Sequence, residues 1–330
     1  MASILVTGGS GFVGQHLIKS LRLENHHVTS LNRSELDLAN YNPAEKALTR
    51  NQDVLIHLAS FVNINDMLKN PQETIANNIN STLNLLEDVR LNNPSCLFIF
   101  LSSEKVYGNA AGKLNTNTFN DNSINNTNGI NIDEEHPTIP VDPYGSSKLI
   151  SELLIKSYHS NYNLNYIVLR AGNIFGPSQK PGLFIPSIIT KIIEHPENVT
   201  LGSLEAYRNF IYIEDLINAI NNCIKKTEDS SEAHSEILNQ TFNLSSYNLK
   251  IAEVLKEIIT LANLAGINPN IIQDKNLFRA SETQAQRYFL NCEKANRLLN
   301  WQPQYQFQNA IKTTFDSYPK KSRNLTSSNK

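Results

Sequence analysis

The chain has 330 residues, enough for one large or two modest domains with a substantial core. Hydrophobic residues make up 40% of it and charged residues 18%, an ordinary composition for a soluble globular protein. Its formal net charge of −2 lacks the basic excess that binds nucleic acids or anionic membranes, so neither partner is expected.

Strand-like and helical patterns alternate along the first half of the chain. Short apolar runs such as ILVTG and CLFIFLSS are typical of strands in a parallel sheet that is covered on both faces. Between such runs, apolar residues recur at helical spacing, as at Ile75, Ile79, Leu83, Leu86 and Val89. The predicted elements are strand 4–8, helix 13–23, strands 26–31 and 53–59, helix 74–90, strand 96–103, helix 144–158 and a strand from 166. This alternation predicts an α/β fold with a doubly wound parallel sheet.

Three glycines stand between the first predicted strand and the first predicted helix. Gly8, Gly11 and Gly14 allow a tight turn there and a close approach of the backbone to a pyrophosphate. The amino end of the following helix attracts the negative charge of such a group. The order of strand, glycine loop and helix therefore predicts a dinucleotide-binding site.

The tip of the second predicted strand lacks the acid that would bind the ribose hydroxyls of NAD. The stretch TSLNRSELDL places Asn32 and Arg33 at this position instead. A guanidinium suits the extra 2′-phosphate of NADP, and the missing carboxylate would not repel it. Asp37 is expected to begin a short strand, LDL, a little further on.

A serine, a tyrosine and a lysine suggest proton-transfer chemistry. Ser102 and Ser103 end a predicted strand at the carboxyl edge of the sheet, where open α/β sheets carry their active sites. Tyr144 and Lys148 lie four residues apart, on one face of a predicted helix. An ammonium beside a phenol is expected to lower the pKa of the phenol toward neutrality, making it a general acid or base. His57, inside an apolar strand, is interpreted as a satisfied core histidine.

Two segments are expected to be exposed. Residues 109–132 are dominated by Asn, Thr and Gly and are predicted to form an inserted loop, because they bury too little apolar surface to offset their ordering entropy. Residues 320–330 are predicted to be a disordered tail.

The three cysteines are far apart, at Cys96, Cys223 and Cys292, and fit neither a metal nor a disulfide spacing. No metal site is therefore predicted. Buried thiols, together with a sequence that shows no secretion signal and no apolar run of membrane-spanning length, predict a cytoplasmic location.

Taken together, these motifs resemble those of the extended short-chain dehydrogenase/reductases, the group of NAD(P)-dependent nucleotide-sugar epimerases, dehydratases and reductases. The matching segments are TGGSGFVG, HLAS, NNINSTLNLLEDVR, LSSEKVYG, PYGSSKLISE, LRAGNIFGP, RNFIYIEDL and, more loosely, LLNWQP. The resemblance implies a Rossmann-type sheet plus a smaller, mostly C-terminal substrate-binding domain. It places the NAD(P)-binding domain at 1–172 and the nucleotide-sugar-binding domain mainly at 173–319, with 208–226 and 240–246 returning to the first. A homodimer formed through the Tyr144-bearing helix is implied as well.

The family pattern also implies the site residues. Ser103, Tyr144 and Lys148 correspond to the catalytic triad, and Asn77 to an asparagine on the helix that supports the lysine. Asn173 corresponds to a contact of the substrate's diphosphate or sugar, and Asp37 to a contact of the adenine amino group. The implied cofactor contacts are Gly8, Gly11, Phe12, Val13, Gly14, Asn32, Arg33, Asp37, Leu38, Leu58, Ala59, Tyr144 and Lys148. The implied substrate contacts are Ser103, Glu104, Asn173, Arg208 and Arg279, the last by a loose match.

Departures from the family pattern separate its branches. Sugar 4,6-dehydratases carry a carboxylate that removes the C5 proton two positions after the catalytic serine or threonine, and this chain has Lys105 there. A 4-keto reductase and a 4-epimerase remain open. NADPH, favoured by Asn32 and Arg33, suits a reductase that must release spent cofactor, whereas an epimerase retains NAD. A non-catalytic, cofactor-sensing relative is a further alternative, although such relatives usually lose the tyrosine or the lysine.

Overall fold

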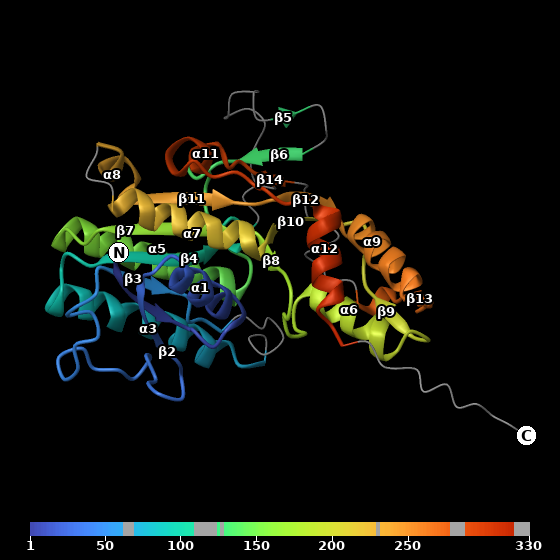
Figure 1. Cartoon of the computed structure of the whole chain (residues 1–330), viewed down its shortest axis with the longest axis horizontal. Coiled ribbons are helices and arrows are strands. Elements are labelled where there is room, and N and C mark those ends of the chain that lie inside the picture. Colours follow the sequence, from blue (N-terminus) through green and yellow to red (C-terminus); the bar gives the residue numbers. More distant parts are fainter. Residues whose placement is uncertain (62–68, 109–123, 126–128, 229–231, 278–287, 320–330) are drawn as a thin grey trace, which may run out of the picture. The chain divides into compact units, whose positions relative to one another are not determined.

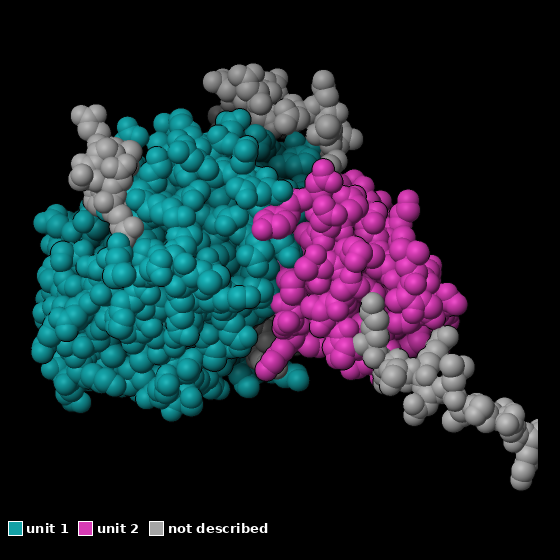
Figure 2. All heavy atoms as spheres, in the orientation of Figure 1, with its two compact units in different colours: residues 1–174, 208–248, 285–304 teal, residues 175–207, 249–284, 305–330 magenta. Residues whose placement is uncertain are grey.

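The computed structural model describes residues 1–61, 69–108, 124–125, 129–228, 232–277 and 288–319. The predicted C-terminal tail and most of the predicted insertion lie outside these residues. Two compact units divide the chain, one formed by residues 1–174, 208–248 and 285–304, and the other by residues 175–207, 249–284 and 305–330 (Figure 2).

Unit 1 is built on a six-stranded sheet in which every neighbouring pair is parallel (Figure 1). The strands, in spatial order, are β11 (Gln240–Leu244), β7 (Tyr166–Ala171), β4 (Leu97–Ser103), β3 (Val54–His57), β1 (Ser3–Thr7) and β2 (His27–Leu31). The predicted α/β fold with a Rossmann-type parallel sheet is confirmed. The direction of winding reverses between β1 and β3, and ligands of open α/β sheets bind beside that reversal, at the carboxyl ends of the strands.

Four long helices cover this sheet. Helix α3 (Pro71–Asn92) packs against α5 (Pro143–Tyr162), and α1 (Phe12–Leu23) packs against α7 (Ile213–Glu228). Apolar side chains from the strands fill the core beneath α3 and α5, among them Leu55, Phe98 and Phe100. Strands of such composition are buried on both faces, as the continuous apolar runs predicted.

The contact between α3 and α5 is more polar than the helical stripe predicted. Asn78 Nδ2 donates to Ser147 Oγ over 3.0 Å, and Thr82 Oγ1 lies 3.2 Å from Ser151 Oγ. Ile75, Ile79 and Leu83 are only half-buried, whereas Leu86 and Val89 of the same stripe are fully buried. The predicted helix is confirmed, and in the first half of α3 short side chains that satisfy one another's hydrogen bonds form the buried face.

The remaining elements of the described chain are shorter. In chain order they are η1 (Glu104–Val106), β5 (Ile124–Asn125), β6 (Gly129–Ile132), β8 (Asn173–Phe175), α6 (Phe184–Glu194), β9 (Val199–Leu201), β10 (Tyr207–Tyr212), α8 (Glu232–Ile237), β12 (Tyr247–Lys250), α9 (Ile251–Leu264), β13 (Ile271–Gln273), η3 (Lys275–Leu277), β14 (Tyr288–Leu290), α11 (Glu293–Leu299) and α12 (Phe307–Asp316).

Strand β6 corrects the predicted end of the exposed insertion. It pairs in parallel with β14, and the Ile132 side chain is fully buried with Val106, Tyr107 and Leu290. Residues 129–132 therefore belong to the packed fold, because Ile130 and Ile132 supply the apolar surface that the preceding stretch lacks.

In unit 2, helix α9 packs against α6 and against α12, and β13 pairs in parallel with β9. Across the described ranges, no helix has the length and apolar content needed to cross a membrane. All three cysteines are free thiols; Cys96 and Cys223 are buried as predicted, while Cys292 is half-buried.

Candidate functional site

A pocket opens where β1, β2 and β3 end, beside the reversal of the sheet. Its walls are the loops that follow these three strands, together with one face of α3, and all of them lie in unit 1. Of the predicted site residues, the pocket is lined by Gly8, Gly11, Asn32, Arg33, Asp37, Leu38, Leu58, Ala59 and Asn77. It is also lined by residues that sequence reasoning missed: Ser10, Leu31, Leu36, Ala39, Ser60, Phe61, Asn78 and Ser81. Phe12, Val13, Gly14, Tyr144 and Lys148 do not line it.

The glycine loop has the close packing that a phosphate cradle needs. Gly8 has a φ of +73°, and a Cβ there would lie 2.8 Å from the backbone nitrogen of Ala59. A Cβ at Gly14 would lie 2.3 Å from the Gly8 carbonyl oxygen. Helix α1 begins after Gly11 without a side-chain cap, so amide donors at its amino end remain available to an anion.

Two buried polar atoms in the pocket wall also fit a bound dinucleotide. Asn32 Oδ1 and Ser60 Oγ are buried and make no hydrogen bond within the described part of the chain. Leaving such atoms unpaired costs free energy, and a ligand hydroxyl group would satisfy either of them. Donors, acceptors and the glycine cradle together fit a dinucleotide in this pocket.

The tip of β2 contains an acid after all. The backbone N–H of Asn32 donates to Glu35 Oε2 over 2.9 Å, so a carboxylate three residues along the chain returns to this tip. The Arg33 guanidinium lies 4.6 Å from the ring centroid of Phe61. The signal for Glu35 was its spacing of three from Asn32, typical of a side chain that folds back on its own turn.

The predicted LDL strand is wrong. Asp37 lies in a turn, where its Oδ1 accepts from the Ala39 backbone N–H over 3.2 Å and its Oδ2 from Asn40 Nδ2 over 2.8 Å. Aspartate side chains favour such local bonds, and these replace the pairing of a strand.

The predicted catalytic residues lie on β4 and α5. Ser103 ends β4, where its Oγ accepts from the Lys105 backbone N–H over 3.2 Å. Helix α5 begins at Pro143, and Asp142 caps it by accepting from the Gly145 N–H over 2.7 Å. This start sets Tyr144 in the first turn, so that Lys148 follows one turn later on the same face.

Lys148 is held inside the protein. Its ammonium nitrogen donates to the Leu101 carbonyl oxygen over 2.8 Å and lies 5.8 Å from the ring centroid of Tyr144. Burial lowers the pKa of Lys148 to about 7, and the nearby carboxylate of Glu152 partly opposes that shift. Burial raises the pKa of Tyr144 well above its usual value, while a hydrogen bond with Ser103 lowers it slightly.

These directions differ from the expectation that Lys148 would bring the pKa of Tyr144 toward neutrality. The physical reason is that burial disfavours both charged forms, the phenolate of Tyr144 and the ammonium of Lys148. In addition, the Lys148 ammonium donates a hydrogen bond to the Leu101 backbone carbonyl oxygen. In the protein by itself, Tyr144 is therefore a protonated phenol.

Neighbouring asparagines on α3 divide two tasks. Both line the pocket; Asn77 is half-buried, whereas Asn78 is buried and also supports α5 through its bond to Ser147. Asn78 Oδ1 also accepts from the Phe61 N–H over 2.8 Å, which ties the loop after β3 to α3. The contact that joins α3 to the lysine-bearing helix thus comes from the residue after the predicted one.

His57 is confirmed as a satisfied core histidine. Its ring nitrogens lie 2.8 Å from Thr7 Oγ1 and 3.2 Å from Thr82 Oγ1, and its side chain is fully buried. Burial lowers its pKa to about 3, so the ring is neutral and serves packing.

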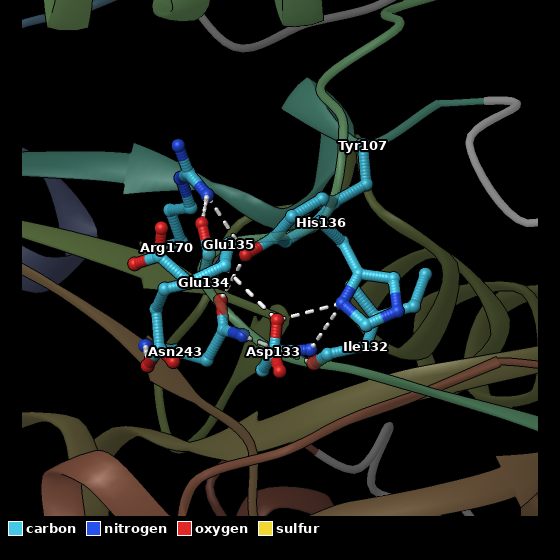
Figure 3. Close-up of polar contacts among 8 residues, drawn as sticks. All are labelled: Tyr107, Ile132, Asp133, Glu134, Glu135, His136, Arg170 and Asn243. Carbon is cyan, nitrogen blue, oxygen red and sulfur yellow. Dashed lines mark hydrogen bonds and ion pairs between the residues drawn. The ribbon is translucent and has the colours of Figure 1, made fainter. Parts of the chain in front are cut away.

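Behind the catalytic residues lies a buried ion pair. Arg170 of β7 pairs with Glu152 of α5 over 2.7 Å, and Ser102 donates to the same carboxylate. Arg170 Nη1 also donates to Tyr107 Oη over 2.8 Å and to the Glu134 carbonyl oxygen over 3.2 Å (Figure 3).

The segment that leads into α5 is anchored by the same group of residues. The Asn243 backbone N–H donates to Glu134 Oε1 over 2.7 Å, and Asn243 Nδ2 donates to the Ile132 carbonyl oxygen over 3.1 Å (Figure 3). These bonds hold residues 132–136 at the end of β11, which fixes the approach of the chain to the start of α5.

The predicted substrate contacts are only partly brought together. Glu104 and Asn173 are hydrogen-bonded to each other over 2.7 Å next to Ser103. Burial raises the pKa of Tyr288 well above its usual value, and the charge of the nearby Arg208 partly opposes that rise. The Glu104 side chain is 1% exposed, and both of its carboxylate oxygens accept hydrogen bonds from protein side chains. Arg279 lies outside the described residues.

Residues 4–243 match the family described as the NAD dependent epimerase/dehydratase family. The chain belongs to this family. Among curated relatives, a dTDP-D-glucose 4,6-dehydratase of Dictyostelium discoideum is 29% identical over 78% of this chain and 62% of its own length. A putative UDP-glucose 4-epimerase of Methanocaldococcus jannaschii is 27% identical over 94% of this chain and 96% of its own length.

Solved structures share the fold of this family member. A UDP-glucose 4-epimerase of Thermotoga maritima, solved with UDP-glucose, aligns over 96% of this chain and 98% of its own, with a TM-score of 0.78 and 22% identity. RMD from Pseudomonas aeruginosa, complexed with NADPH, aligns with the same coverage, a TM-score of 0.77 and 24% identity. The members of this family are enzymes that bind NAD(P).

Proposed function

We propose that this family member transfers hydride between NAD(P) and the C4 carbon of a nucleotide-activated hexose, and that its net reaction is reduction of a 4-keto sugar with NADPH. The observation that carries the proposal is the location of Ser103, Tyr144 and Lys148 in the unit that holds the dinucleotide pocket. Asn78 links the two, because it lines the pocket and bonds to the residue before Lys148.

Bound NADPH supplies the hydride for this chemistry. The Gly8 and Gly11 backbone would hold its pyrophosphate at the start of α1, and Arg33 would pair with its 2′-phosphate.

Tyr144 is suited to the reductive direction. A buried phenol whose pKa is raised stays protonated at neutral pH, and reduction of a carbonyl requires a proton donor for the new hydroxyl oxygen. Ser103, hydrogen-bonded to Tyr144, would orient the substrate oxygen toward that proton. Lys148 would hold the nicotinamide end of the site and supply positive charge near the phenol.

Dehydration is disfavoured by the two residues after Ser103. Both oxygens of Glu104 accept bonds from protein side chains, and the next residue is Lys105. A protonated lysine cannot take a proton from C5, so the dehydratase activity of the Dictyostelium relative is not proposed here.

A 4-epimerase with retained NAD is the second candidate, and the Glu35 carboxylate favours it. A carboxylate held at the tip of β2 suits free ribose hydroxyls and opposes a 2′-phosphate. The putative epimerase among the relatives supports the same interpretation. A non-catalytic, cofactor-sensing role is less favoured because the chain keeps all three catalytic side chains.

The decisive experiment measures turnover directly. Purified protein would be assayed with NADPH and a panel of nucleoside-diphosphate 4-keto-6-deoxyhexoses or their acetamido analogues. A parallel assay would monitor interconversion of UDP-hexoses without added cofactor. We expect oxidation of NADPH coupled to a new sugar hydroxyl; epimerisation by protein that carries NAD from purification would establish the second candidate instead. Turnover of none of these substrates would refute both.

Tyr144→Phe should lower turnover roughly 10²–10⁴-fold, because it removes the proton donor and keeps the ring. Tyr162→Phe, an exposed tyrosine on the same helix, is the matched control and should be neutral. Activity of Tyr144→Phe within a few-fold of the wild type would exclude Tyr144 as the proton donor.

A further inference from the structure

An arginine and a phenylalanine from two different loops meet at the dinucleotide pocket. Arg33 follows β2 and Phe61 follows β3, and β1 lies between these two strands in the sheet. Both residues line the pocket, and the guanidinium carbon of Arg33 lies 4.6 Å from the centroid of the Phe61 ring. Their contact therefore joins the loops on either side of β1, the strand that leads into the glycine loop.

The hydrogen-bond donors of Arg33 remain free. A guanidinium carries five N–H donors in one plane, which suits the oxygens of a phosphate. Among the described residues, no acceptor receives a hydrogen bond from Arg33 and no carboxylate pairs with it. Glu35, only two residues later, bonds to the Asn32 backbone N–H instead. The Phe61 ring thus holds the guanidinium while its donors stay available to an anion.

Phe61 itself is fixed by Asn78 of α3. The Phe61 backbone N–H donates to Asn78 Oδ1 over 2.8 Å, and the Phe61 carbonyl oxygen accepts from Asn78 Nδ2 over 3.4 Å. Asn78 Nδ2 also donates to Ser147 Oγ of α5 over 3.0 Å. Because both hydrogens and the oxygen of this amide are in use, the backbone of Phe61 is anchored to two of the helices that cover the sheet.

An anchored ring can restrict the arginine before any ligand binds. A long, exposed side chain loses rotamer freedom when it binds a ligand, and this loss weakens the binding. Arg33 is exposed, and Phe61 keeps 37% of its surface exposed, so the contact is one between a cation and an aromatic ring close to water. A guanidinium that already lies against the ring loses less freedom when a phosphate arrives.

We propose that Phe61 is a positioning residue for cofactor choice, and that its ring holds the Arg33 guanidinium where the 2′-phosphate of NADPH binds. This inference rests on the proposed pairing of Arg33 with that phosphate. It gives a specificity role to the loop after β3, in addition to the tip of β2. Since NADH lacks the 2′-phosphate, Phe61 affects the affinity for NADPH and not that for NADH.

A double-mutant cycle on dinucleotide binding, measured by titration calorimetry, tests this role. Phe61→Leu keeps the apolar bulk and removes the ring, so it should weaken NADPH roughly two- to fivefold and leave NADH nearly unchanged. Phe61→Tyr keeps the ring, is the matched control and should bind both dinucleotides as the wild type does. In the Arg33→Ala background, Phe61→Leu should cause no further loss of NADPH affinity, because Phe61 acts through Arg33.

Two adenosine phosphates separate the 2′-phosphate from the nicotinamide. Phe61→Leu should weaken adenosine 2′,5′-bisphosphate by the same factor as NADPH and should leave adenosine 5′-phosphate nearly unchanged. Equal losses of NADPH and NADH in Phe61→Leu, or additive losses in the cycle, would overturn the inference and make Phe61 a general wall of the pocket. An unchanged preference for NADPH in Phe61→Leu would overturn it too, and would leave the pairing of Arg33 intact. A wild type that does not prefer NADPH refutes that pairing itself, and the role of Phe61 with it.

Discussion

The relative affinity of the protein for NADPH and NADH tests the role of the charged residues at the tip of β2. Arg33 lines the pocket, its guanidinium lies against the Phe61 ring, and the Glu35 carboxylate is bonded to the Asn32 N–H in the same turn. We propose that Arg33 pairs with the 2′-phosphate. Arg33→Ala should therefore weaken NADPH and leave NADH nearly unchanged.

The size of the effect depends on the type of bond and its exposure. A hydrogen bond to a charged group contributes about 1.5–3 kcal/mol, which corresponds to roughly ten- to hundredfold in affinity. Arg33 is exposed, so salt screens its charge, and we expect the lower end of that range, about tenfold. Glu35→Gln should act in the opposite direction and strengthen NADPH a few-fold, because it removes a negative charge from the turn that carries Asn32 and Arg33.

Fluorescence or calorimetric titration of both dinucleotides against the wild type, Arg33→Ala and Glu35→Gln measures these changes. Arg50→Ala, an exposed arginine outside the pocket lining, is the control and should bind both dinucleotides as the wild type does. Raising the salt concentration should shrink the wild-type preference for NADPH. Tighter binding of NADH by the wild type, or an equal loss of both dinucleotides in Arg33→Ala, would refute the pairing and favour the epimerase.

Three further changes have predictable outcomes. Burial lowers the pKa of Lys148 to about 7, so above that pH the unfolded chain binds a proton that the folded chain lacks. The free energy of unfolding should therefore rise from pH 7 to 9 by up to about 1.4 kcal/mol per pH unit. Urea titrations should show this rise for the wild type and not for Lys148→Met. Glu152→Gln breaks the buried pair with Arg170 and should lower the free energy of unfolding by about 3–5 kcal/mol, whereas Glu135→Gln, on an exposed residue, should change it by less than about 0.5 kcal/mol; equal effects would show that the pair does not stabilise the fold. The family resemblance implies a dimer through α5, where the Leu153 side chain is 58% exposed. Light scattering should therefore show monomers for Leu153→Glu and dimers for the control, Leu264→Glu on α9. A monomeric wild type would contradict the implied interface.

Local patterns in the sequence were enough to predict the sheet and its edge. The segment from Leu97 to Ser103 consists of five apolar residues followed by two serines. Such a segment is typical of a central strand that is covered on both faces and ends in polar side chains at the carboxyl edge of the sheet. Likewise, the spacing between Tyr144 and Lys148 sets their common helical face whatever surrounds them. The glycine loop is predictable for the same reason, because the strand, turn and helix that define it are neighbours in the chain.

Contacts between segments that are distant in the sequence could not be predicted from local patterns. Nothing in the spacing of Glu104, Asn173, Asn209 and Tyr288 says that they share one hydrogen-bond network, because four separate segments bring them together. The polar contact between α3 and α5 depends in the same way on which face each helix turns to the other, so the apolar stripe of α3 was a poor guide to its buried side.

The ionisation of the catalytic pair shows the difference most clearly. The sequence by itself determined that a lysine comes one helical turn after the tyrosine, and this spacing predicts a lowered phenol pKa. Only the tertiary structure decided how deeply both groups are buried and that Lys148 donates to the Leu101 carbonyl oxygen. Burial disfavours a charged group because the protein replaces the water around it. The residues that surround Tyr144 and Lys148 come from β4, α3 and α5, so no single stretch of the sequence determines how deeply the two groups are buried.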